Sequence, residues 1–135
     1  MKLHGPWMLY ADDKQSEPER IKLPGKLTLG GNPVCAPCTL RRRFGTPTGL
    51  TDSDHVILVF HGVTSFAIAS LESQTLGEIA SESTIGFDIT PFLVGNNYLQ
   101  LAFKETAEPV GVCEVRIDIA DDSEIRTTSY PVINP

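Results

Sequence analysis

The chain has 135 residues, of which 11 are Lys or Arg and 17 are Asp or Glu, giving a formal net charge of -6. A chain of this length is expected to fold as one domain with its own core. The acidic balance argues against a nucleic-acid partner, because phosphate binding depends on Lys and Arg. The short run Arg41-Arg42-Arg43 does not change that balance.

The sequence offers no sign of a membrane partner. No stretch approaches the ~18 consecutive apolar residues of a membrane span. The first residues, MKLHGPWMLYADD, carry Pro6 and acids where a signal peptide needs a longer apolar region. This pattern predicts a cytoplasmic protein. A secreted protein whose signal peptide has been removed would show the same pattern and is the alternative.

The N-terminal part predicts short extended pieces. Residues 3–10 (LHGPWMLY) read as a first strand, and residues 11–20 as a polar loop or frayed helix. In residues 39–44 the side chains alternate, so that Leu40, Arg42 and Phe44 share one face. If that face is the core, Arg42 is buried and needs a carboxylate partner.

The stretch from Val56 to Gly77 predicts the centre of the fold. Val56–Phe60 is a run of five apolar residues that fits a strand buried on both faces. A second extended segment follows at 65–71, and we expect it to lie beside the first. The polar turn at 72–74 then lies at one rim of the sheet.

The C-terminal half continues the strand pattern. Thr90-Pro91 predicts one helical turn over Pro91–Val94, with Thr90 as its cap. Residues 97–103 and 112–119 alternate as strands, and an edge strand is expected around 125–130. Many short strands and almost no helical period predict an all-β, antiparallel sandwich. Residues 1–120 would form its single domain, and 121–135 an edge strand or tail of that domain.

The three cysteines do not form a disulfide framework. Cys113 belongs to an alternating run and is interpreted as a small buried hydrophobe. Cys35 and Cys38 form a CxxC pair in a loop, without the strand and helix of a redox motif. Zinc would need two more ligands, and the available residues, which lack ligand spacing, are Cys113, His4, His55 and His61. We therefore predict no metal and no cofactor.

Several short motifs occur in an order that resembles a known domain. They are Leu3-x-Gly5-x-Trp7, Leu23-Pro24-Gly25, Arg42-x-Phe44, Leu58-x-Phe60-x-Gly62-Val63-x-Ser65, Leu76-Gly77, Phe87-Asp88-Ile89-Thr90 and Asn97-x-Leu99. The series is similar to the N-terminal sugar-binding domain of family 2 glycoside hydrolases, which precedes the barrel in β-galactosidases and β-glucuronidases. The resemblance implies a jelly-roll sandwich of the galactose-binding type.

The departures from that family matter for function. The family's Trp-x-Asn-Gly turn is replaced by Ser70-Leu71-Glu72-Ser73, so its Trp and Asn are missing. The barrel that carries the two catalytic carboxylates is also missing from this sequence. No nucleophile elbow, metalloprotease motif or phosphate-binding Gly loop occurs. The sequence therefore predicts a protein that is not an enzyme.

Two function classes remain. One is a carbohydrate-binding module, and the other is a structural or protein-interaction sandwich that has lost sugar binding. A saccharide site would be built from rim loops. Its predicted ligand-binding residues are Glu72, Gln74, Glu82, Ser83 and Tyr98. The aromatic rings available for stacking are Phe66, Tyr98, Tyr10 and Tyr130.

The resemblance also suggests a partner for Arg42. It places Asp88 near the same core edge, so we expect a structural ion pair between Arg42 and Asp88. Removing one partner of such a buried pair costs roughly 3 to 5 kcal/mol.

Overall fold

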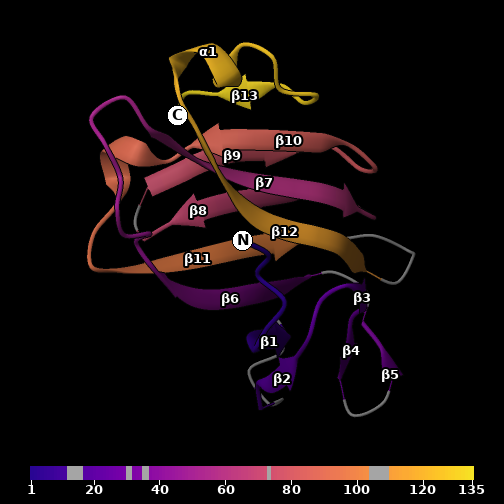
Figure 1. The fold of residues 1–135 in the computed structure, drawn as a ribbon. Helices are drawn as coiled ribbons and strands as arrows, with labels where there is room; N and C mark the ends of the chain where they lie inside the picture. Colours follow the sequence, from indigo (N-terminus) through magenta and orange to yellow (C-terminus); the bar gives the residue numbers. More distant parts are fainter. Residues whose placement is uncertain (12–16, 30–31, 35–36, 73, 104–109) are drawn as a thin grey trace.

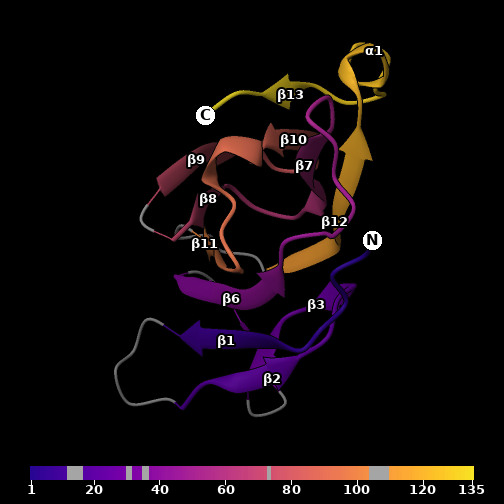
Figure 2. The same ribbon diagram turned by 60° about the vertical axis from the view of Figure 1, so that its left-hand side comes forward.

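A computed structural model describes residues 1–11, 17–29, 32–34, 37–72, 74–103 and 110–135. Within them the chain forms two stacked sheets and a short hairpin (Figure 1, Figure 2). The six-stranded sheet runs β2 (Glu19–Ile21), β1 (Trp7–Ala11), β6 (Cys38–Gly45), β11 (Asn96–Phe103), β8 (Ala67–Leu71) and β9 (Gln74–Ile79). The five-stranded sheet runs β13 (Val132–Ile133), β10 (Thr84–Asp88), β7 (His55–Val63), β12 (Gly111–Ala120) and β3 (Gly25–Lys26). The hairpin is β4 (Thr28–Leu29) with β5 (Asn32–Pro33).

The sheets confirm the predicted all-β, antiparallel jelly-roll sandwich. Among the described strands, pairing is antiparallel except between β10 and β13, which are parallel. The core between the sheets contains the buried Trp7, whose indole nitrogen donates to the Leu3 carbonyl at 2.8 Å. Phe60 and Phe87 meet there edge to face, with ring centroids 6.1 Å apart. Such a core comes from alternating strands that bury one face each.

Strand β7 is buried on both faces, as its apolar run predicted. Val56, Leu58 and Phe60 belong to the core between the sheets. Ile57 and Val59 point to the other side, where they pack against Tyr130. Because β7 lies between β10 and β12, both its edges are also paired. A strand enclosed in this way has no polar face, which explains its continuous hydrophobic sequence.

The second segment of the central stretch is not beside the first. Strand β8 lies in the six-stranded sheet, whereas β7 lies in the five-stranded sheet. The prediction that these two strands pair was therefore wrong. The intervening residues 64–66 carry the chain from one sheet to the other. Adjacent strands of a sandwich often change sheets in this way, and hydrophobic pattern alone does not distinguish the change from a hairpin.

The last residues cover the outside of the five-stranded sheet. The helix α1 (Asp122–Ile125) starts with a capping box, in which Asp121 accepts from the backbone of Ser123 and Glu124. The edge strand is β13, so its predicted place around 125–130 was wrong. A Cβ on Gly86 would lie 2.7 Å from Tyr130, so this glycine permits the close approach of the covering ring.

Helices are short throughout the described residues. The predicted turn after Thr90 is the 3-10 helix η1 (Thr90–Phe92), and Ile89 occupies its N-cap position without a side-chain cap. Thr90 is thus inside the turn rather than capping it. Neither η1 nor α1 is long and apolar enough to cross a membrane.

Cys113 is exposed, which corrects the prediction that it is buried. In β12 the core-facing residues are Val112 and then Val115, so the alternation shifts by one residue between them. Gly62 on the neighbouring strand has a φ of 64°, and a Cβ there would lie 2.7 Å from the sulfur of Cys113. The left-handed backbone at Gly62 lies beside this shift in β12, where Cys113 faces away from the core.

Candidate functional site

The side chains that point away from the core on the six-stranded sheet form a continuous surface, which we name the outer face. Cross-strand pairing places one row of it across all six strands: Arg20, Met8, Arg41, Gln100, Ser70 and Thr75. None of these side chains is buried. The adjacent row, Leu9, Leu40, Leu101 and Ala69, is buried completely. Because paired residues point to the same side of a sheet, polar and apolar rows separate cleanly.

Two tyrosine rings on the outer face are each covered on one side by an arginine. The guanidinium carbon of Arg43 lies 4.6 Å from the ring centre of Tyr98, and that of Arg41 lies 4.8 Å from Tyr10. Arg43 also donates to the Tyr98 hydroxyl, and Arg41 Nε donates to Gln100 Oε1 at 2.9 Å. These cation–π and hydrogen-bond contacts hold both guanidinium groups at defined positions on the surface.

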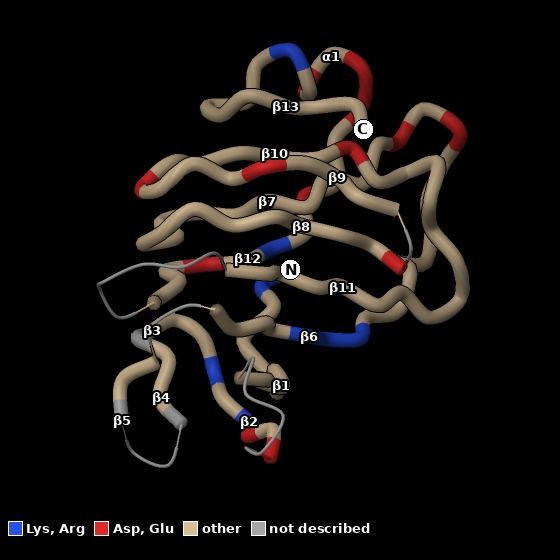
Figure 3. Tube along the Cα trace, turned by 180° about the vertical axis from the view of Figure 1, so that it is seen from behind, with Lys and Arg blue, Asp and Glu red and all other residues tan. Residues whose placement is uncertain are grey.

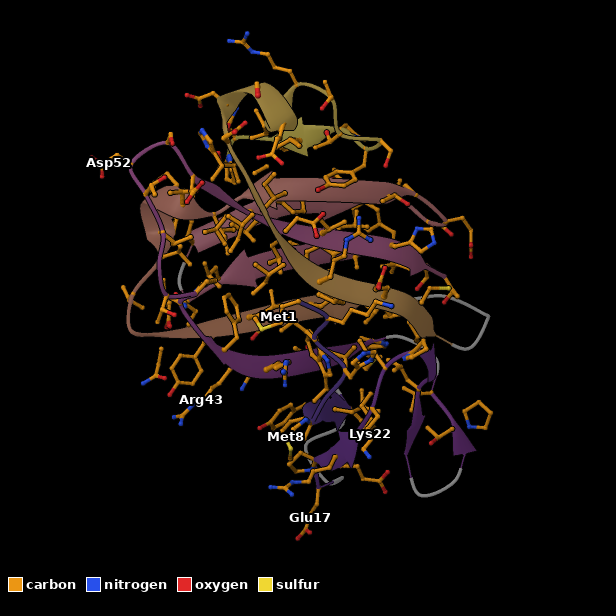
Figure 4. The ribbon with its side chains drawn as sticks, viewed as in Figure 1. Met1, Met8, Glu17, Lys22, Arg43 and Asp52 are labelled. Atoms are coloured by element: carbon orange, nitrogen blue, oxygen red, sulfur yellow. The ribbon has the colours of Figure 1, made fainter. Side chains whose placement is uncertain are left out.

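Beside β1, β2 and β6 the outer face is hollowed into a cleft of about 430 Å³. We name it the arginine cleft, and its lining residues are Pro6, Met8, Tyr10, Arg20, Arg41, Arg42, Arg43 and Tyr98. Four of them are arginines, and no Asp or Glu is among them. Figure 4 shows Met8 and Arg43 projecting from β1 and β6, and Figure 3 shows basic positions along β6. This local positive charge contrasts with the net charge of -6.

Arg42 differs from its neighbours because it is half-buried. Its Nη1 is 3.4 Å from the Pro6 carbonyl, a long contact, and its Nε is buried without a hydrogen-bond partner. Burial lowers the pKa of Arg42 below the ordinary value. Arginine nevertheless stays protonated in proteins, so Arg42 adds a positive charge to the cleft.

The cleft arginines have no carboxylate partner among the described residues. The ion pairs among the described residues all lie outside the cleft. They are Lys2–Glu114, Arg116–Glu114, Arg116–Asp118 and those of His55 with Asp88 and Asp122. The protein is acidic, yet among the described residues Arg41, Arg42 and Arg43 have hydrogen bonds only to neutral partners.

Three of the five predicted ligand residues are brought together at one end of the six-stranded sheet. Glu72 has a φ of 53°, and its Oε1 accepts from the backbone nitrogen of Tyr98 at 3.1 Å. The Glu72 nitrogen donates to the Tyr98 carbonyl at 2.9 Å. Gln74 is exposed at the start of β9. Tyr98 therefore joins this turn to the arginine cleft.

Glu82 and Ser83 lie at the other end of the sandwich. The Glu82 nitrogen donates to the carbonyl of Val63, and the Ser83 carbonyl accepts from Gly62, so their turn contacts the end of β7. Strand β9 separates this turn from Gln74, and its length is roughly 17 Å at the usual rise per residue. The expectation that both turns lie close together was wrong, because the intervening segment is a strand rather than a loop.

The predicted ion pair between Arg42 and Asp88 does not form. Arg42 is in β6 of the six-stranded sheet, and Asp88 ends β10 of the other sheet. Asp88 Oδ1 instead accepts from the nitrogen of Thr90 at 3.1 Å and from its hydroxyl at 2.6 Å. Its Oδ2 lies 2.7 Å from Nδ1 of His55.

Asp88 and His55 belong to a cluster that connects four elements, β7, β10, η1 and α1, at one end of the five-stranded sheet. His55 begins β7, and its Nε2 lies 2.6 Å from Oδ1 of Asp122 in α1. Hydrogen bonds to Asp122 and Asp88 raise the pKa of His55, which favours its charged form. The 3-10 turn joins the cluster through Thr90, whose hydroxyl also accepts from the Val56 nitrogen. We interpret the cluster as structural, because its polar groups satisfy one another.

Metal binding has no support from the described residues. No group of three or more His, Cys, Asp or Glu side chains there could hold an ion. Cys38 is buried in β6, whereas Cys35 lies outside the described residues. The CxxC pair is therefore not tested as a site.

The sequence interpretation missed the arginine cleft as a site. The alternation of residues 39–44 did place Arg41 and Arg43 on one face, opposite Leu40 and Phe44, and the structure confirms this. That signal, combined with the exposed positions of β11, could have indicated a basic and aromatic surface. The register that brings Arg20 into the same row is not readable from local sequence.

Comparisons with known proteins place the fold. No family model matches the chain, and no curated protein matches it by sequence. An FMN-binding β-glucuronidase from Faecalibacterium prausnitzii L2-6 has a similar structure, with a TM-score of 0.75 and 15% identity over 90% of this chain and 22% of that chain. A glycosyl hydrolase family 2 member from Bacteroides cellulosilyticus DSM 14838 gives 0.71 and 13% identity over 89% and 20%. A β-D-mannosidase from Dictyoglomus thermophilum gives 0.64 and 21% identity over 77% and 15%.

The chain spans about a fifth of the length of these enzymes. The similarity covers nearly all of the present chain, so it concerns one domain-sized part of each longer protein. The resemblance expected from the sequence motifs is thereby confirmed at the level of the fold. This chain has the fold of a domain found in glycoside hydrolases of family 2.

Proposed function

We propose that this chain is a non-catalytic carbohydrate-binding module that holds a saccharide on the outer face of its six-stranded sheet. The observation that carries the proposal is the alignment of exposed tyrosine rings with hydrogen-bonding side chains on one surface. Tyr98 is 43% exposed, and Tyr10 is half-buried.

The chemistry of this face suits sugars. A pyranose ring packs its apolar side on an aromatic ring, and its hydroxyls need both donors and acceptors. The rings of Tyr10 and Tyr98 offer the first, and Arg41, Gln100 and Glu72 offer the second. The cleft of about 430 Å³ is within the usual range for a small-ligand site.

The fold comparison supports the proposal without determining a ligand. The similar structures are named as enzymes that act on glycosides, and each is much longer than this chain. We assign no catalytic step to the cleft, because its described lining contains no Asp or Glu, whereas glycoside hydrolysis requires two carboxylates.

A glycan-array screen tests this function. The purified chain is expected to bind at least one saccharide, and the double variant Tyr10→Ala, Tyr98→Ala to lose that binding. Phe66→Ala is the matched control, because Phe66 is also an exposed ring, 38% accessible, but precedes β8 and is not among the residues that line the cleft. Loss of binding in the control alone would move the site away from the outer face. Absence of binding to every glycan would reject the function.

The second candidate function is a structural or protein-interaction sandwich. A larger hollow of about 1070 Å³ lies near the ends of β6 and β12 and includes Met1, Phe44 and Ile119. Met1 is 65% exposed and Ile119 is 47% exposed, so apolar side chains face solvent there. A protein partner would bury them. An array without any bound glycan favours this candidate.

A further inference from the structure

We propose that the arginine cleft binds the anionic group, carboxylate or sulfate, of an acidic oligosaccharide. This inference rests on the proposed function and names the class of ligand that the outer face selects. It follows from the charges, the spacing and the free donors of the cleft.

Three arginines of the cleft lie close together on the outer face. Arg20 and Arg41 are both paired in register with Met8, so they flank it on neighbouring strands and lie about 10 Å apart at the usual strand spacing. Arg41 and Arg43 are two residues apart on one face of β6, about 7 Å from each other. Like charges placed this closely repel one another when no counter-charge is present. A bound anion removes that repulsion, and the described lining supplies none of its own.

The cleft arginines have more N–H donors than their described partners accept. A guanidinium has five N–H groups, and its planar fork matches the two oxygens of a carboxylate. Arg20 has no ion pair among the described residues, and Arg41 and Arg43 use part of their donors on the neutral Gln100 and Tyr98. Arg42 uses its Nη1 only in the long contact to the Pro6 carbonyl, whereas its partnerless Nε is buried beyond the reach of a ligand. Donors therefore remain for a ligand.

The size of the surface argues for an oligosaccharide over a single ion. Tyr10 is paired with Thr39 and Tyr98 with Arg43, so the two rings lie beside positions four residues apart on β6. This separation is about 13 Å along the strand. One inorganic anion cannot contact both rings and the arginines between them. A chain of several sugar units with an acidic substituent can.

Titration calorimetry with matched probes tests the inference. The probes are tetrasaccharides of galacturonate, glucuronate-containing hyaluronan and sulfated chondroitin, the methyl ester of the galacturonate probe, a neutral galactose tetrasaccharide and inorganic sulfate. At least one acidic probe is expected to bind at least tenfold tighter than its neutral counterpart and than inorganic sulfate. Hyaluronan and chondroitin both carry glucuronate, so tighter binding of the sulfated chondroitin than of hyaluronan identifies sulfate as the preferred group, and equal or weaker binding identifies the carboxylate.

Single variants locate the interaction. Arg41→Gln and Arg43→Gln are each expected to weaken binding roughly tenfold, as a charge-assisted hydrogen bond to a ligand does. Arg126→Gln changes the net charge equally from the exposed end of α1 and should leave the affinity unchanged. Equal loss in all three variants, or equal binding of the acid and its ester, would overturn the inference.

The outcomes separate this inference from the proposed function. Binding of neutral glycans alone on the array and in the calorimeter would leave the module intact and reject its acidic ligand. Absence of any saccharide binding would reject both. Retained circular dichroism in each variant excludes unfolding as the cause of a loss.

Discussion

The charged groups of two regions differ in their partners. In the Asp88 cluster, formed by His55, Asp88, Thr90 and Asp122, the polar groups bind one another, whereas the arginine cleft has no carboxylate partner among the described residues. Asp88 is 6% exposed and accepts from the backbone and side chain of Thr90 while it also contacts His55, all within 3.1 Å. The cleft arginines are more exposed and pair with neutral groups of the described chain. A charge that the fold satisfies itself stabilises the fold. A charge left without a counter-ion is available to a ligand.

The contrast between the two regions is greater because the protein has an excess of carboxylates, with a net charge of -6. Carboxylates near the other end of the molecule gather at α1 and at the 52–54 loop (Figure 3). Arg116 shows that an arginine of this chain can find partners, since it contacts both Glu114 and Asp118 at 2.9 and 3.1 Å. In the part of the chain that the structure describes, the arginines of the cleft have no such partner. Four predictions test this contrast, in order from the largest expected effect on stability to the smallest.

Removing the Asp88 carboxylate should cause the largest loss. Asp88→Ala removes a buried carboxylate and leaves the half-buried donors of Thr90 and His55 without their acceptor, which is expected to cost about 3 kcal/mol of unfolding free energy. Urea denaturation measures it. Asp122→Ala is the control, because its side chain is 73% exposed, and it should cost less than about 1 kcal/mol. Equal costs would show that the cluster is a surface feature.

The same cluster should make stability depend on pH. Hydrogen bonds to Asp122 and Asp88 raise the pKa of His55 above its ordinary value of 6.5. A raised folded pKa means that the contribution of His55 is complete below pH 6.5 and is lost as pH rises through the folded pKa. We expect this contribution to be about 1 kcal/mol, as for partly exposed pairs.

Denaturation of the wild type and of His55→Gln between pH 5 and pH 9 checks this dependence. The difference in unfolding free energy between them should be greatest at the acidic end and should shrink toward pH 9. A difference that grows with pH would contradict the raised pKa.

Arg42→Met should change stability little, within about 1 kcal/mol. The methionine keeps the packing of the arginine stem and removes an Nε that is buried without a partner. An ion pair with Asp88 would instead have made this substitution cost several kcal/mol. Thermal unfolding of the variant therefore distinguishes the observed unpaired Nε of Arg42 from the ion pair with Asp88 that the sequence predicted. A large loss would show that Arg42 is needed for the fold.

Arg41→Gln should have the smallest effect on stability, within about 0.5 kcal/mol. Its side chain is exposed, and among described residues it contacts only the neutral Gln100 and the ring of Tyr10. The same denaturation measurement applies. A loss comparable to that of Asp88→Ala would place this arginine with the structural charges and remove it from the ligand site.

Local patterns predicted the long strands but not their partners, and they missed β9 and misplaced β13. The alternation around Leu40 and Phe44 and the continuous apolar run at 56–60 each predicted the correct faces. The crossing of the chain between β7 and β8 was missed, because apolar periodicity does not say in which sheet a strand lies. Cys113 was misplaced for a related reason, since the irregular backbone at Gly62 belongs to another strand.

The candidate site was predictable only in part. The turn at Glu72 and the exposure of Tyr98 followed from the loop chemistry and the alternation of β11. The distance between Gln74 and Glu82 depended on recognising β9 as a strand. The arginine cleft depended on the register between β2, β1 and β6, which long-range packing determines.

Mapping ligand contacts by NMR tests the central claim most directly. In a ¹H–¹⁵N spectrum titrated with the acidic tetrasaccharide that binds best, the largest shifts should belong to the backbone of β1, β6 and β11 and to the arginine Nε–H groups of the cleft. The amides of the Glu82–Ser83 turn and of the His55 and Asp88 cluster should not move. Shifts confined to either of those two places would contradict the assignment of the outer face as the ligand site and of the Asp88 cluster as a structural element.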